Sequence, residues 1–168
     1  MSVGAIYYAK QGRTYVLKFI GDIRYTMSCS LDQFLERLFD DSDFDAIAID
    51  LTGVTAIDST NLGLLAKVAN QMRRRSSTKQ SLHSTNPEVN QVLLSMGLED
   101  VFELCFDNDC RSCPKTIRLL QISDPSKDEM ARTMLDAHCV LSDLNDNNRR
   151  EFRQVVSTLR RRTSGASS

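Results

Sequence analysis

The apolar residues in the first part of the chain follow two spacings, one typical of strands and one typical of helices. Residues 15–20 are rich in β-branched and aromatic side chains and stop at Gly21-Asp22, which predicts a strand followed by a turn. Residues 46–51 form an apolar run broken only by Asp50, which predicts a central strand covered on both faces. Thr52-Gly53 is expected to end or bend that strand. Between the two strands, one buried helical face is predicted by Leu31, Phe34, Leu35, Leu38 and Phe39, and a capping box at its start by Ser30 and Gln33.

Helical spacing returns after residue 59 and alternates with strand signals up to residue 106. Residues 73–75 are three arginines, which suit the carbonyl end of the second helix. The next helix is expected to be capped by Asn86, with Pro87 in its first turn and Gly97 at its end. Residues 81–85 and 101–106 predict strands on either side of it. Strands that alternate with helices predict an α/β fold with a mainly parallel sheet. The buried face of the second helix is predicted to consist of Leu62, Leu65, Ala66, Ala69 and Met72.

The remainder of the chain predicts a separate helical unit. Residues 108–125 read as a connector with an apolar patch at 117–122 that could add a strand. Residues 126–144 and 149–162 are amphipathic and are joined by the polar link 145–148, which predicts a helical hairpin. We therefore expect a first domain over residues 1–107, the connector 108–125, a C-terminal hairpin over 126–163 and a disordered tail over 164–168.

Composition and charge narrow the class of protein. The chain has 168 residues, 41% of them hydrophobic, and a net charge of −1, so it is not expected to bind nucleic acid or a membrane surface. No apolar run approaches the roughly 20 residues that span a bilayer, and the start of the chain lacks the features of a signal peptide. A cytoplasmic protein is expected. Arginine-rich residues 146–162 and acidic residues 99–109 are interpreted as solvated faces or helix ends, with docking surfaces as the alternative.

Motifs for enzymatic or metal chemistry are sparse. Cys110 and Cys113 form a CxxC pair, but a structural zinc site needs four ligands, and neither His83 nor His138 has a matching spacing. Redox sensing by this pair stays open, since Pro114 allows a helix to start there; free thiols are the alternative. No phosphate-binding loop or hydrolase motif is present. The sequence predicts no enzyme, no cofactor and no metal.

The polar run Asp58-Ser59-Thr60-Asn61 stands where the chain changes from strand to helix. One interpretation is that Asp58 or Ser59 caps the helix. The other uses the same physics, because the unpaired N–H groups and partial positive charge of a helix N-terminus also tolerate an anion. A phosphate on Ser59 would add roughly −1.5 to −2 charges beside Asp58 without unfolding the helix. It would repel a partner that packs over this turn.

These residues carry a resemblance to a known family. The stretch IAIDLTGVTAIDSTNLGLLAKV resembles the signature of STAS domains, specifically of bacterial anti-sigma factor antagonists. Their pattern is an aliphatic strand ending in Asp, matched by Asp50, and then Asp-Ser-Ser-Gly-Leu-Gly opening a helix. Residues 86–104 also resemble the family's later helix and last strand, so the likeness covers about residues 10–107. Thr60 and Asn61 depart from the pattern, and Asn61 is expected to keep the turn because Asn tolerates unusual backbone angles.

The resemblance implies a STAS-like mixed, mainly parallel sheet and a phosphorylation switch. In such proteins the serine that matches Ser59 is phosphorylated by a serine kinase that is often itself the anti-sigma factor. The unphosphorylated form binds the anti-sigma factor and releases sigma, and a PP2C-type phosphatase restores that form. Asp58 is expected to assist recognition, Asp50 to bind nearby turn N–H groups, and Thr60 to be the second phosphorylation candidate. The expected docking surface comprises Asp58, Ser59, Thr60, Asn61, Leu62 and Gly63.

Three alternatives stay open. The protein could be a STAS scaffold in signalling or transport that docks without phosphate control. It could be a redox regulator that uses Cys110 and Cys113. The C-terminal hairpin could cover the second face of the sheet or bind a second partner.

Overall fold

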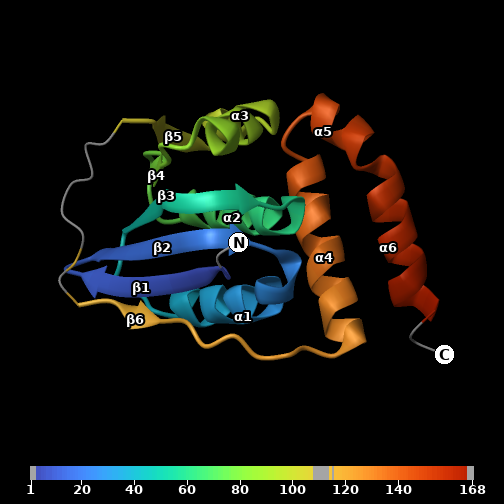
Figure 1. Cartoon of the computed structure of the whole chain (residues 1–168), viewed down its shortest axis with the longest axis horizontal. Coiled ribbons are helices and arrows are strands. Elements are labelled where there is room, and N and C mark those ends of the chain that lie inside the picture. The colour runs from blue at the N-terminus through green and yellow to red at the C-terminus, as the bar shows by residue number, and fades with distance from the viewer. Residues whose placement is uncertain (1–2, 108–113, 115, 166–168) are drawn as a thin grey trace.

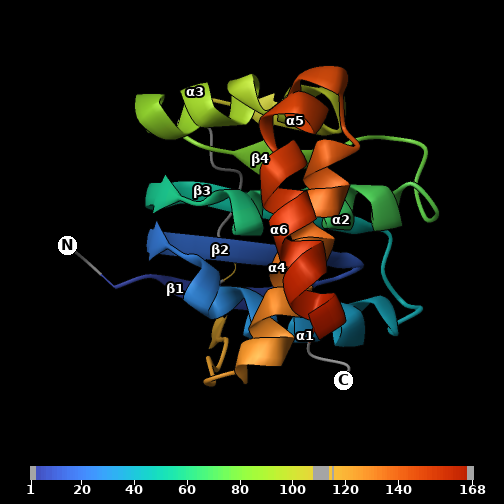
Figure 2. The ribbon, with the colours of Figure 1, turned by 90° about the vertical axis from the view of Figure 1, so that its right-hand side faces the viewer.

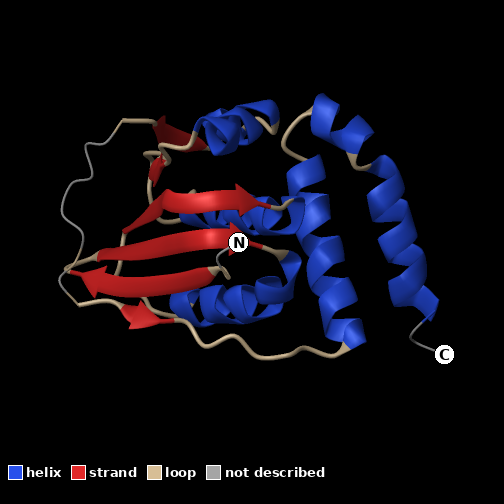
Figure 3. Ribbon diagram, viewed as in Figure 1, coloured by secondary structure: helices blue, strands red, loops and turns tan. Residues whose placement is uncertain are grey.

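The computed structural model describes residues 3–107, 114 and 116–165. Its sheet has the strand order β5-β4-β3-β2-β1-β6, with β2 to β5 parallel and β1 antiparallel to both of its neighbours. Figure 3 shows the strands as one layer. The predicted mixed, mainly parallel sheet is confirmed. The strands are β1 (Ala5–Gln11), β2 (Thr14–Ile23), β3 (Ala46–Ile57), β4 (Gln80–His83), β5 (Phe102–Cys105) and β6 (Arg118–Leu119).

Two helices cover one face of this sheet. Helix α1 (Ser28–Phe39) and helix α2 (Ser59–Met72) lie side by side behind the strands in Figure 1, and α3 (Pro87–Ser95) packs against β3. Single 3-10 turns, η1 (Tyr25–Met27) and η2 (Leu98–Asp100), precede α1 and β5. The core lies between the sheet and α1 and α2, as the apolar spacing predicts. Its fully buried side chains include Leu17, Phe19, Ile49, Leu62 and Leu65.

Some element boundaries differ from the sequence prediction. Strand β2 continues through Gly21-Asp22, because Gly21 has a φ of 83° and the register with β3 shifts there instead of the chain turning. Strand β3 likewise continues past Thr52-Gly53 to Ile57. The predicted capping box at Ser30 is wrong, since α1 starts at Ser28 without a side-chain cap. Ser30 Oγ instead accepts a hydrogen bond from the Ser123 N–H at 3.0 Å.

The C-terminal helical unit consists of α4 (Lys127–Ser142), α5 (Asp146–Glu151) and α6 (Arg153–Gly165). Ser126 and Glu129 form the capping box that starts α4. The second predicted helix starts earlier than expected, because Asn145 caps a short α5 inside the expected link. It is divided at Phe152, whose side chain is buried. One interpretation of the sequence placed this unit over the second face of the sheet, but the unit does not cover that face. Figures 1 and 2 show α4 across the ends of β2 and β3, packed on α2 and α1, with α6 on its outer side.

Candidate functional site

The start of α2 is held by Asp58, as one interpretation of the sequence proposed. Asp58 is the N-cap, and its Oδ1 accepts hydrogen bonds from the Asn61 N–H at 3.0 Å and from Asn61 Nδ2 at 2.9 Å. Asn61 therefore stabilises the capping carboxylate from within the helix. Asn61 lies inside α2, in the helical backbone, so it is not kept for an unusual backbone angle. Ser59 follows the cap as the first residue of α2.

The Ser59 hydroxyl meets a side chain from the far end of the sequence. Its Oγ lies 2.9 Å from Nε2 of His138 in α4, and the other ring nitrogen, Nδ1, lies 2.7 Å from the Met134 carbonyl oxygen. A carbonyl only accepts, so Nδ1 carries the hydrogen, and in the neutral ring Nε2 accepts from the Ser59 hydroxyl. His138 is only 3% exposed, and its ring packs edge-on against Phe152 at 5.5 Å.

One turn further along, α2 and α4 touch backbone to backbone. A Cβ built on Gly63 would lie 2.1 Å from the Ala137 carbonyl oxygen, so this crossing requires glycine in α2. The next turn of α2 carries Lys67, whose Nζ lies 2.7 Å from Asp136 and 3.0 Å from Asp32. Burial lowers the pKa of Lys67, but the hydrogen bonds to Asp136 and Asp32 outweigh it and raise that pKa. Helix α4 is thus joined to α2 over three successive turns.

This arrangement decides how accessible the predicted docking residues are. Asp58 and Ser59 are partly exposed. Thr60, Asn61 and Leu62 are at most 2% exposed, and Gly63 is buried. With α4 in this position, a protein partner reaches only the edge of the predicted surface.

Sequence reasoning missed His138, and the one signal for it was its position four residues after Met134 on the apolar stripe of its helix.

Arg24 supplies a cation near the cap. Hydrogen bonding to the Asp22 carboxylate, Nε to Oδ2 at 2.7 Å, raises the pKa of Arg24, and the Asp58 charge adds to this effect. The Arg24 side chain is 60% exposed. An anion at the start of α2 would therefore meet both the helix N-terminus and a nearby guanidinium group.

Other residues singled out in the sequence have structural roles or lie outside the described part. Asp50 is 6% exposed and lies in the middle of β3, not at the end of a strand as expected. Its Oδ1 accepts from the Thr52 N–H at 2.9 Å and hydroxyl at 2.6 Å, so it binds a group within the strand and not a turn N–H. Cys110 and Cys113 lie outside the described residues.

Within the described part, no cluster of three or more His, Cys, Asp or Glu residues could hold a metal ion. No helix there has the length and apolar character to cross a membrane.

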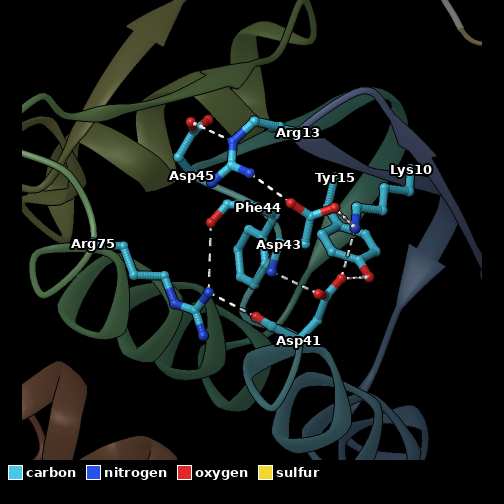
Figure 4. A network of polar contacts seen from close by, with 8 residues as sticks. All are labelled: Lys10, Arg13, Tyr15, Asp41, Asp43, Phe44, Asp45 and Arg75. Carbon is cyan, nitrogen blue, oxygen red and sulfur yellow. Dashed lines mark hydrogen bonds and ion pairs between the residues drawn. The ribbon is translucent and has the colours of Figure 1, made fainter.

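A second polar cluster joins the end of β1, the start of β2, the loop between α1 and β3, and the turn after α2 (Figure 4). Asp41 Oδ2 accepts from Lys10 Nζ at 2.8 Å and from the Tyr15 hydroxyl at 2.7 Å. Burial and then the Asp41 carboxylate raise the pKa of Tyr15 to about 12. The Arg75 guanidinium lies 4.1 Å over the Phe44 ring and donates to the Asp41 carbonyl at 2.7 Å. These contacts join β1, β2, the loop before β3 and the turn after α2.

Comparison with known proteins identifies the family. The sequence model of the STAS domain matches residues 5–109, so the chain belongs to the STAS domain family. The fold is similar to that of an anti-sigma factor antagonist from Mycobacterium paratuberculosis, with a TM-score of 0.55 and 21% identity over 64% of this chain and 89% of that one. It is also similar to the Bacillus cell fate determinant SpoIIAA in the phosphorylated form, with a TM-score of 0.50 and 14% identity over 60% and 91%. No curated protein sequence matches. Helices α4 to α6 lie beyond the family match.

Proposed function

We propose that this protein is a cytoplasmic, non-enzymatic anti-sigma factor antagonist whose binding is switched off by phosphorylation of Ser59. The observation that carries the proposal is the position of Ser59, a partly exposed hydroxyl on the first residue of α2 beside the capping Asp58. An anion is favourable there because of the helix dipole, and Arg24 adds a cation. The unphosphorylated form binds an anti-sigma factor through residues 58–63. A serine kinase and a PP2C-type phosphatase set the phosphorylated fraction, and Thr60 is the second acceptor.

The test compares Ser59→Ala with Ser59→Asp as full-length baits for the anti-sigma factor of the native cell. Ser59→Ala should bind constitutively, and Ser59→Asp should bind at least about tenfold more weakly, since about 1.4 kcal/mol of repulsion is enough for that ratio. Ser59→Thr serves as the control because it keeps an acceptor hydroxyl. Equal affinities for Ser59→Ala and Ser59→Asp would contradict the switch.

A second candidate is a STAS scaffold that docks its partner without phosphate control. It is favoured by the engagement of the Ser59 hydroxyl with His138 and by the burial of Thr60. Intact-mass analysis of the protein from native cells separates the two candidates. A form about 80 Da heavier, located to the Ser59 peptide, supports the switch, and its persistent absence supports the scaffold.

A further inference from the structure

The surface proposed for the partner already carries a helix of the same chain. We infer that α4 is a displaceable occupant of this surface, and that the partner takes its place with an amphipathic helix that has a small residue opposite Gly63. This inference rests on the proposed function, because it specifies how a partner reaches residues 58–63.

Contacts along one side of α4 describe the shape and chemistry that this surface accepts. At the centre, Gly63 lets the two backbones touch, and a partner with a bulky residue there could not approach as closely. Polar contacts lie on either side of that crossing. The closest pairs are Met130 with Ser28 at 3.9 Å, Thr133 with Cys29 at 3.2 Å, Asp136 with Lys67 at 2.7 Å and His138 with Ser59 at 2.9 Å.

The attachment of α4 is weaker than that of the core helices. Of its sixteen residues only Ala137, His138, Leu141 and Ser142 are buried, whereas ten residues of α2 are buried. It joins the core through Ala137 and Leu141, and its polar contacts with α1 and α2 include the hydrogen bonds to Cys29 and Ser59 and the ion pair with Lys67. A helix held by few buried apolar contacts opens at a lower free energy than the core. Opening of α4 is therefore expected without unfolding of the sheet.

Opening of α4 and docking of a partner are linked, because α4 and a partner helix compete for the same place on α2. Gly63 can touch only one backbone at a time, so α4 and a partner helix cannot both occupy this crossing. The apparent affinity of the partner is then the affinity of the open surface multiplied by the fraction of open molecules. Residues of α4 that hold it on α2, such as His138, therefore set the affinity of the protein for its partner without touching that partner.

The native Cys29 thiol reports this opening directly. Cys29 is 3% exposed beneath α4, with its Sγ 3.2 Å from Thr133 Oγ1. Alkylation by iodoacetamide, followed by mass spectrometry of the Cys29 peptide, measures how often α4 opens. His138→Ala should raise the labelling rate by about tenfold, as expected for loss of a buried hydrogen bond and its packing. Cys139→Ser is the matched control, because this neighbouring thiol faces Arg160 and not α2.

The urea dependence of that rate separates local opening from global unfolding. A local opening exposes little surface, so labelling should depend only weakly on urea. The inference is overturned if Cys29 labels with the urea dependence of global unfolding, or if His138→Ala labels no faster than Cys139→Ser.

A second experiment tests whether the surface binds a helix supplied from outside. The probe is a fluorescein-labelled peptide of residues 126–144 with Cys139→Ser, which keeps the Ser126 capping box. The full chain is to be locked by Thr133→Cys, designed to form a disulfide with Cys29 on oxidation because Cys29 Sγ lies 3.2 Å from Thr133 Oγ1; non-reducing mass spectrometry checks that the bond has formed. Fluorescence anisotropy should show binding to His138→Ala, weaker binding to the wild-type chain and none to the oxidised lock, with recovery after reduction. The double variant Cys29→Ser/Thr133→Cys controls for the substitution and should bind regardless of oxidation.

Equal binding of the peptide to open and locked chains, or no binding to any of them, overturns the inference. Neither experiment contains an anti-sigma factor or a phosphate. If Ser59→Ala and Ser59→Asp bind the anti-sigma factor equally, the proposed function fails while the peptide result stands. If the peptide does not discriminate between the chains, the displaceable helix fails while the phosphate switch stands.

Discussion

At the scale of single residues, the site divides into contacts within one turn and contacts between distant segments. The cap is local, because Asp58 and Asn61 are three positions apart, and sequence spacing predicts such a contact. The Ser59–His138 contact joins residues 79 positions apart. No pattern along the chain specifies that pair, because it depends on how α4 crosses α2. His138 therefore has no predicted role beyond its lack of a zinc-ligand spacing.

The capping contact between Asp58 and Asn61 leads to a prediction for Asp58→Ala. This substitution removes the carboxylate that accepts from the Asn61 N–H and from Asn61 Nδ2, so both donors lose their partner. The free energy of unfolding should fall by about 1–2 kcal/mol, measured by urea denaturation. Asp58→Asn is the control, because Asn is also a good cap, and it should lose much less. A change below about 0.3 kcal/mol in Asp58→Ala would show that the cap is not stabilising.

At the scale of elements, the sequence predicts which segments are helices and strands better than it predicts where they end. Strand β1 was not predicted, and β2 and β3 both run past their glycines, since pairing in a sheet outweighs local turn preference. Tertiary contacts also decide the break at Phe152, whose side chain is buried beside His138. The capped starts of α3 and α4 need no such context, and Asn86 was predicted correctly for α3.

The crossing of α2 and α4 gives a prediction for Gly63→Ala. Alanine favours an isolated helix by about 1 kcal/mol over glycine, so propensity alone predicts stabilisation. The added Cβ would lie 2.1 Å from the Ala137 carbonyl oxygen, and one backbone must move. We expect a net loss of about 1–3 kcal/mol, typical of overpacking, in urea denaturation. Gly165→Ala in α6 is the control, since nothing lies within 4 Å of its Cβ. A Gly63→Ala protein as stable as the wild type would disprove the close contact.

At the scale of the whole molecule, the two ends of the sheet are organised differently. The end near α4 carries the contact between Ser59 and His138. The opposite end is fastened by the charged cluster of Figure 4, in which the side chain of Asp41 binds β1 and β2 through Lys10 and Tyr15. The placement of the C-terminal unit across the helix ends could not be predicted, because amphipathic helices show that a face is buried and not what buries it.

The charged cluster around Asp41 predicts how the free energy of unfolding changes as the pH falls. Hydrogen bonds from Lys10 and then from Tyr15 hold the pKa of Asp41 well below its usual range in the folded protein. A lowered folded pKa gives stability that is present above the unfolded pKa of about 3.9 and is lost as pH falls below it toward the folded value. Asp41→Asn removes that titration, so its unfolding free energy should change less steeply below about pH 4 than that of the wild type.

The measurement is urea denaturation at a series of pH values between neutral and strongly acidic. Asp146→Asn is the matched control, because the Asp146 side chain is 86% exposed and its ion pair in the described part of the chain is with Arg149 of its own helix. It should keep the wild-type slope. High salt should weaken the effect of Asp41, since this pair is partly exposed to solvent and is screened. Parallel acid profiles for Asp41→Asn and the wild type would mean that another carboxylate governs the acid stability of this end.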